Sequence, residues 1–108
     1  MEYRRIGNSG LKVSVVGLGG NNFGGRADAA ASVKIISQAL DLGINFIDTA
    51  ESYNDGHSEE AVGKAVKGRR DKVIIATKFG NPRSAGLDNQ GGSRRYVMAA
   101  VDASLKRL

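Results

Sequence analysis

The chain is organised around the stretch Asn45-Phe46-Ile47-Asp48-Thr49-Ala50-Glu51-Ser52-Tyr53. Its first residues are bulky and apolar and Gly43 marks their entry, so a buried strand is predicted from about Ile44. A buried strand has little reason to end in an acid such as Asp48 unless that acid is paired or functional. Small and polar residues follow, and the stretch ends at Tyr53.

A second apolar run ends in the same way. Val73-Ile74-Ile75-Ala76-Thr77-Lys78 reads as a strand whose last residue is a lysine. In α/β enzymes the carboxyl ends of parallel strands meet at one edge of the sheet and form the active site. Two strands that each deliver an ionisable group to this edge therefore predict a site that contains Asp48, Tyr53 and Lys78.

Length and composition limit the alternatives. The chain has 108 residues, which suits one small domain or part of a larger one. Its longest apolar runs fall far short of the roughly 20 residues of a membrane helix, so no membrane partner is expected. The sequence has no cysteine, which excludes disulfides and cysteine-ligated metals, and no other cluster of metal ligands is visible. A cytoplasmic location is the expectation.

The net charge of +5 does not indicate a nucleic-acid partner. The densest basic group lies between residues 64 and 72, at a predicted helix end and the loop after it. Cations are favourable at a helix C-terminus, so this group is interpreted as a solvated helix end. It consists of Lys64, Lys67, Arg69, Arg70 and Lys72.

The predicted element order is a β-hairpin over residues 2–14 followed by three β-α units over 15–42, 44–67 and 73–108. Alternating strands and helices imply a parallel sheet. The predicted N-caps of the three helices are Asp28, Ser58 and Ser93. Helical spacing predicts that the following residues face inward: Val33, Ile36 and Leu40; Ala61, Val62, Ala65 and Val66; Val97, Val101, Leu105 and Leu108.

Three parallel strands leave open edges, and a parallel sheet needs cover on both faces. The chain is therefore expected to be the first part of a larger (β/α)₈ barrel. The chain is expected to stop within or just after the third helix of that barrel. A polar loop over residues 79–92, with four glycines and the only proline, is long enough to serve as a lid or wall of the site.

The three candidate residues fit one reaction. An unperturbed tyrosine is a reluctant proton donor at neutral pH. An ammonium group within reach favours the phenolate, and a carboxylate would hold that ammonium charged and in place. A phenol tuned in this way can give a proton to a carbonyl oxygen or remove one from an alcohol. Lys78 and Asp48 are thus expected to tune Tyr53 as a general acid.

Other interpretations exist for each part of this pattern. Taken alone, Asp48 could cap a turn, Tyr53 could pack in a loop, and Lys78 could be a solvated strand end. The glycines at 17 and 19 suggest a dinucleotide-binding Gly-x-Gly-x-x-Gly motif, but Asn22 replaces its third glycine. His57, the only histidine, is expected to be an exposed loop residue.

The sequence resembles the N-terminal third of an aldo-keto reductase. The matching segments follow the family order along nearly the whole chain: Gly10-Leu11-Lys12-Val13-Ser14, Gly17-Leu18-Gly19, Gly43-Ile44-Asn45-Phe46-Ile47-Asp48-Thr49-Ala50, Tyr53, Gly56 with Ser58-Glu59, Ala76-Thr77-Lys78 and Ser104-Leu105-Lys106-Arg107-Leu108.

This resemblance implies a (β/α)₈ TIM barrel whose bottom is closed by the N-terminal hairpin, and reduction of small-molecule aldehydes or ketones with NADPH. It implies Tyr53 as the general acid, with Lys78 and Asp48 tuning it. Among cofactor contacts it implies Asp48 beside the nicotinamide ribose, and Gly20, Asn21 and Asn22 in the loop near the nicotinamide.

Family members often have a threonine and a bulky residue where this chain has Gly20-Asn21-Asn22, so the substrate pocket does not transfer. The fourth catalytic residue of the family, a histidine, and most contacts to the cofactor phosphates are expected beyond Leu108. Residues 1–108 alone are therefore predicted to be inactive. Related barrels also serve as channel β-subunits, so a non-catalytic binding or regulatory subunit is the alternative.

Overall fold

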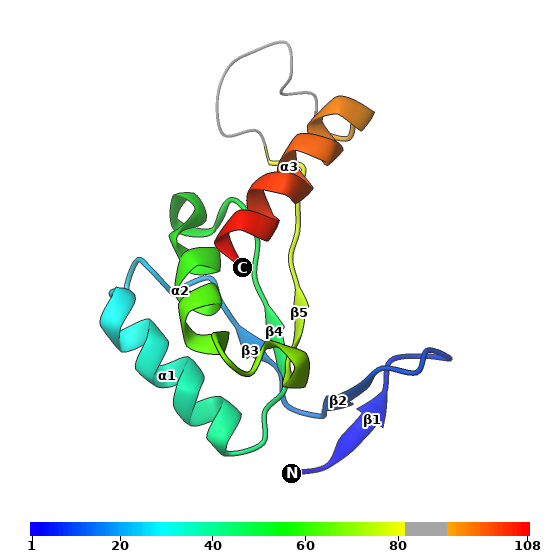
Figure 1. The fold of residues 1–108 in the computed structure, drawn as a ribbon, viewed down its shortest axis with the longest axis vertical. Coiled ribbons are helices and arrows are strands. Elements are labelled where there is room, and N and C mark those ends of the chain that lie inside the picture. The colour runs from blue at the N-terminus through cyan, green and yellow to red at the C-terminus, as the bar shows by residue number, and fades with distance from the viewer. Residues whose placement is uncertain (82–90) are drawn as a thin grey trace.

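The computed structural model describes residues 1–81 and 91–108, and its elements follow the predicted order (Figure 1). Most of the predicted lid, residues 82–90, lies outside the described residues. No helix in the described parts of the chain is long and apolar enough to cross a membrane. The elements are β1 (Tyr3–Arg5), β2 (Lys12–Ser14), β3 (Leu18–Gly19), α1 (Ala29–Asp41), β4 (Phe46–Asp48), the 3₁₀ turn η1 (Tyr53–Gly56), α2 (His57–Val66), the 3₁₀ turn η2 (Arg70–Lys72), β5 (Ile74–Ala76) and α3 (Arg94–Arg107).

The hairpin is attached to the N-terminal end of the parallel sheet. Strands β1 and β2 pair antiparallel, with Arg4 opposite Val13. The side chain of Asn45, one residue before β4, accepts a hydrogen bond from Ser14 N at 2.7 Å and donates one to Lys12 O at 3.0 Å. Figure 1 shows the hairpin at this end of the sheet, away from the end toward which β5 runs.

Strands β3, β4 and β5 form a parallel sheet in that order. Ile47 pairs in register with Ile75, and Asp48 with Ala76. Because side chains alternate between the faces of a strand, Ile47 and Ile75 share one face and Asp48 lies on the other. The first face is the buried one, since Ile47 is fully buried and Ile75 packs against the core.

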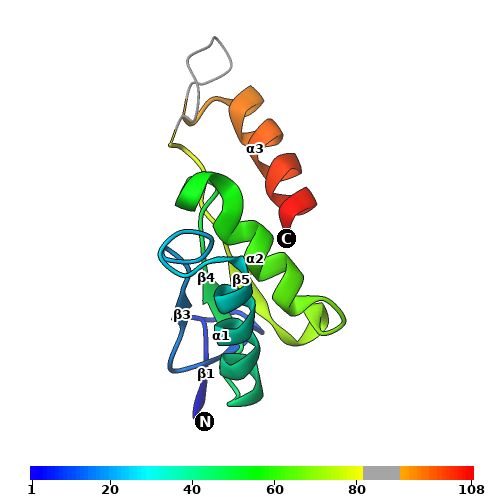
Figure 2. The same cartoon turned by 90° about the vertical axis from the view of Figure 1, so that its left-hand side faces the viewer.

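Helices α1 and α2 cover that face of the sheet, as the two views agree (Figure 1, Figure 2). The inward residues predicted for both helices are confirmed, because each is buried or packed against the core. The Asp28 cap is confirmed as well, since its carboxylate accepts a hydrogen bond from Ala31 N at 2.8 Å. The core consists of Phe23, Ile36, Ile47, Ala61, Val62, Ala65, Val66 and Val73.

The inward stripe predicted for α3 is confirmed only in part, because Leu108 packs against the core and Val97 is half-buried, whereas the two residues between them are exposed. Ser93 caps this helix as predicted, but Val101 and Leu105 are 44% and 71% exposed, whereas Ala100 and Ser104 are buried. The end of α3 is in close contact with α2. At Gly63 an added Cβ would overlap the carbonyl oxygen of Arg107, so the two helices approach more closely than large side chains allow.

The predicted Ser58 cap is also wrong. Helix α2 begins one residue earlier, at His57, and Gly56 precedes it in the left-handed conformation with φ of 89°. The side chain of Ser58 turns into the protein, where its hydroxyl donates to Gly20 O at 2.7 Å and lies 2.8 Å from the Thr49 hydroxyl. Ser58 therefore joins the loop after β3 to the loop after β4.

The close approach at Gly63 predicts that alanine there destabilises the protein. In an open helix Gly→Ala stabilises by about 1 kcal/mol, but overpacking a close contact costs about 1–3 kcal/mol. We expect Gly63→Ala to lower the free energy of unfolding of the whole protein, as measured by urea denaturation. Gly10→Ala is the control, because nothing lies within 4 Å of an added Cβ there. A stabilised Gly63→Ala variant would contradict the contact.

Candidate functional site

The parallel pairing of β4 and β5 continues past the ends of both strands. Thr49 N donates to Ala76 O at 2.8 Å, and Glu51 N donates to Lys78 O at 3.0 Å. Side chains alternate between the two faces of an extended chain, so Lys78 lies on the same face as Ala76, two residues before it. Ala76 in turn pairs with Asp48. The sheet thus directs Asp48 and Lys78 toward the face that α1 and α2 do not cover.

The three predicted site residues come together around the ammonium group of Lys78. Its Nζ donates to Asp48 Oδ1 at 2.7 Å and to Thr49 O at 3.0 Å. It also donates to the Tyr53 hydroxyl oxygen at 3.3 Å and lies 5.0 Å from the centre of the Tyr53 ring. An ammonium in contact with a phenol oxygen stabilises the phenolate that remains after proton transfer. The roles of these residues in a reaction stay predictions.

The surroundings of Lys78 favour its charged form. Partial burial acts to lower the pKa of Lys78, but the hydrogen bonds to Asp48 and Tyr53 and the charges of these groups outweigh it. The net effect raises the pKa of Lys78 above its ordinary value of 10.5. Lys78 is therefore a fixed positive charge across the neutral range, which suits a tuning group better than a proton carrier.

This raised pKa makes a prediction for stability. The contribution of Lys78 to folding is complete below the unfolded-state pKa, near 10.5, and is lost as pH rises through the higher folded-state pKa.

We expect Asp48→Asn to lower the pKa of Lys78, measured by NMR on lysine-labelled protein and assigned with Lys78→Arg. Asp41→Asn, which removes the partner of Arg69, is the control. An unchanged Lys78 titration in Asp48→Asn would contradict the pairing.

Tyr53 is followed by an unusual turn. Asn54 and Asp55 both adopt left-handed backbone conformations, with φ of 48° and 58°. Left-handed residues other than glycine are uncommon and gather at functional sites. The side-chain amide of Asn54 donates to Asn21 O at 2.9 Å and Phe23 O at 2.8 Å. Asn54 therefore connects the Tyr53 turn to the loop that carries Asn21 and Asn22.

The structure places that loop beside Asp48. Gly20 is buried, and its N–H donates to Asp48 O at 2.8 Å. A side chain at position 20 would crowd this contact, because an added Cβ would lie 3.2 Å from Asp48 O. Asn21 and Asn22 are exposed. The loop thus carries two exposed amide side chains close to the backbone of Asp48, and its role as a cofactor contact stays a prediction.

Two further residues beside the Lys78 segment, Glu51 and Tyr96, were not predicted from the sequence. Glu51 is buried, and its Oε1 accepts hydrogen bonds from Gly80 N at 3.1 Å and from the Tyr96 hydroxyl at 2.5 Å. A signal for Glu51 was present, since it is an acid between Asp48 and Tyr53 in the stretch that follows a buried strand. Nothing in the local sequence marks Tyr96, because it lies 45 residues from Glu51.

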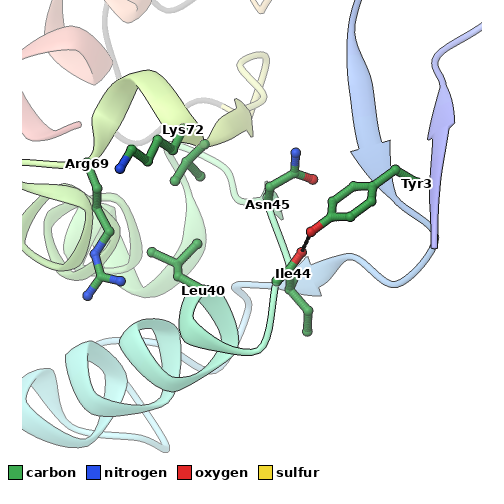
Figure 3. Close-up of a pocket in the computed structure, with 8 residues that line it drawn as sticks. Tyr3, Leu40, Ile44, Asn45, Arg69 and Lys72 are labelled. Carbon is green, nitrogen blue, oxygen red and sulfur yellow. Dashed lines mark hydrogen bonds between the residues drawn. The ribbon is translucent and has the colours of Figure 1, made fainter. Parts of the chain in front are cut away.

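An open cavity of about 320 Å³ lies at the opposite end of the sheet (Figure 3). It is bounded by Asn45 and Val73, which precede β4 and β5, and by Tyr3 from the hairpin. The Tyr3 hydroxyl donates to Gly43 O at 2.8 Å, and Arg69 pairs with Asp41 at 2.8 Å. This cavity shares no residue with the cluster of Asp48, Tyr53 and Lys78. That cluster lies at the C-terminal edge of the sheet and is the candidate site.

Comparisons with known proteins agree on one family. The model of the "Aldo/keto reductase family" matches residues 15–108. The chain is 42% identical over 114 residues to "Aldo-keto reductase YhdN" of Bacillus subtilis, covering 100% of this chain and 34% of that protein. It is 39% identical over 114 residues to "Probable voltage-gated potassium channel subunit beta" of Arabidopsis thaliana, again covering 100% of this chain and 34% of that protein.

A solved structure shows the same fold. The aldo-keto reductase AKR11C1 from Bacillus halodurans, in its holo form, matches with a TM-score of 0.89 and 43% identity, covering 100% of this chain and 36% of that chain. The predicted fold class, the N-terminal portion of a TIM barrel with an N-terminal hairpin, is confirmed by this match. The chain spans about a third of the length of the curated relatives it matches.

Proposed function

The chain belongs to the aldo/keto reductase family, and from this premise we propose that the whole protein is an NADPH-dependent oxidoreductase. It reduces aldehydes or ketones to alcohols, and Tyr53 is the general acid. The observation that carries the proposal is the position of Lys78 Nζ, within hydrogen-bond distance of both Asp48 and the Tyr53 hydroxyl.

Each residue of the cluster has a separate task in this proposal. Tyr53 donates its phenolic proton to the oxygen of the carbonyl substrate as that oxygen becomes negative. The ammonium of Lys78 stabilises the phenolate that is left, and Asp48 fixes the ammonium through the 2.7 Å bond. General acid catalysis of this kind contributes about 10²–10⁴ to the rate.

The residues near the cluster supply part of a cofactor site in this proposal. Asp48 accepts a hydrogen bond from a ribose hydroxyl, and the loop of Gly20, Asn21 and Asn22 binds the nicotinamide end. NADP(H), when bound, supplies the hydride for the carbonyl carbon. The side chain of Asp48 is 44% exposed, so it can serve the cofactor while it holds Lys78.

The test is an assay of the whole protein with NADPH and a panel of aldehydes and ketones, followed by the decrease in NADPH absorbance. Turnover is expected, and replacing Lys78 by methionine is expected to abolish most of it while cofactor binding, measured by fluorescence titration, persists. Turnover that is unchanged in Lys78→Met would refute the assigned mechanism. A cytoplasmic location goes with this proposal and is tested by cell fractionation.

The similarity to the Arabidopsis thaliana protein supports a second candidate, a regulatory or binding subunit without catalysis. On this alternative the whole protein binds NADPH but does not turn over any carbonyl in the panel. Persistent binding without turnover in the wild type would therefore favour the subunit over the enzyme.

A further inference from the structure

We infer that Glu51, held by Tyr96, is a positioning residue that fixes the backbone of Lys78 and so keeps its ammonium between Asp48 and Tyr53. This inference deepens the proposed function and rests on it for its effect on catalysis. The contact between Glu51 and the Lys78 segment stands on the geometry alone.

Glu51 holds the segment after β5 at two points. Its backbone N–H donates to Lys78 O at 3.0 Å, and its side-chain Oε1 accepts from Gly80 N at 3.1 Å. One residue thus binds the chain on both sides of residue 79. The turn that brings Gly80 N to the Glu51 carboxylate gives Gly80 a φ of 108°, a backbone conformation that is readily available only to glycine.

Tyr96 holds the carboxylate in turn. It lies in the first turn of α3, and its hydroxyl is 2.5 Å from Glu51 Oε1. The residue Glu51 is only 4% exposed, so its carboxylate depends on these protein donors in place of water. Loss of the Tyr96 hydroxyl or of the Glu51 carboxylate would leave a buried polar group without one of its partners.

The consequence reaches the ammonium because Glu51 holds the backbone directly after Lys78, where Asn81 adds only longer bonds, to Ser52 at 3.4 Å and to Tyr96 at 3.3 Å. Its side chain is 49% exposed and flexible, so the 2.7 Å bond to Asp48 and the 3.3 Å bond to Tyr53 depend on where its backbone lies. A misplacement of about 1 Å in a reacting group can cost about 10²-fold in rate. Glu51 lies in the short loop between Asp48, the last residue of β4, and Tyr53, the first residue of η1, so it sets Lys78 relative to both.

The experiment uses the whole protein and the variants Glu51→Ala and Tyr96→Phe. Tyr3→Phe is the matched control, because it also removes a phenol that bonds a distant segment, at the other end of the sheet (Figure 3). The first readout is the titration of Lys78 by NMR on lysine-labelled protein. The second is kcat and KM for carbonyl reduction.

We expect the pKa of Lys78 to fall in both test variants and kcat to drop by about 10–100-fold with KM little changed, while Tyr3→Phe changes neither. Tyr96→Phe removes one hydroxyl only, so it remains informative if Glu51→Ala does not fold. An unchanged Lys78 titration in Tyr96→Phe would overturn the inference, whatever happens to kcat. A shifted titration would support it even if the wild type showed no turnover, which would refute only the proposed function.

Discussion

Replacing Tyr53 by phenylalanine is expected to lower kcat for carbonyl reduction by the whole protein by about 10²–10⁴-fold, the usual contribution of a general acid. The change removes one oxygen and keeps the ring, so the packing of the η1 turn survives. It removes the group that Lys78 Nζ contacts at 3.3 Å, but leaves the bond between Lys78 and Asp48. Cofactor affinity is therefore expected to change little.

Steady-state kinetics with NADPH and the best carbonyl of the panel measure this effect, and fluorescence titration measures cofactor binding. Tyr3→Phe, the same chemical change at the other end of the sheet, is the control for general effects of losing a phenol. If Tyr53→Phe retained nearly the wild-type kcat, another group would have to donate the proton.

The second large effect is expected from the ion pair between α2 and α3. Glu59 is fully buried; it accepts a hydrogen bond from Arg107 Nε at 2.6 Å and one from the Thr77 hydroxyl at 2.5 Å. Removing one partner of a buried pair leaves an uncompensated charge and costs about 3–5 kcal/mol. We therefore expect Arg107→Met to lower the free energy of unfolding by about that amount.

Urea denaturation of the whole protein measures the loss. Arg69→Met is the matched control, since Arg69 pairs with an exposed Asp41, and exposed pairs contribute about 0–1 kcal/mol. Combining Arg107→Met with Glu59→Gln removes the buried charge and should recover part of the lost stability. Equal effects of Arg107→Met and Arg69→Met would show that the buried pair does not stabilise the packing of α3.

Prediction from sequence succeeded where the signal is local. The inward faces of α1 and α2 follow from helical spacing, which repeats every few residues. The Asp28 and Ser93 caps depend only on the next three residues. One long-range prediction also succeeded: Asp48 and Lys78, 30 residues apart, could be brought together because the ends of parallel strands share one edge of a sheet.

Prediction failed where a distant contact overrides the local pattern. The spacing of Val101 and Leu105 indicates a buried stripe, but Ala100 and Ser104 are buried in their place, and Gly63 lets α2 approach the end of α3 at Arg107. Ser58 has the chemistry of an N-cap, yet its hydroxyl bonds Gly20 O, 38 residues away.

The hairpin, the alternation of strands and helices, and the three ionisable residues at the sheet edge could thus be predicted from the residues alone. The bonds of Glu51 to Gly80 and Tyr96, and of Asn54 to the loop of Asn21, become visible only in the folded chain. These contacts join segments 29 to 45 residues apart. Spacing and capping rules describe neighbours along the chain, whereas such partners are chosen by how the strand ends and helices pack against each other.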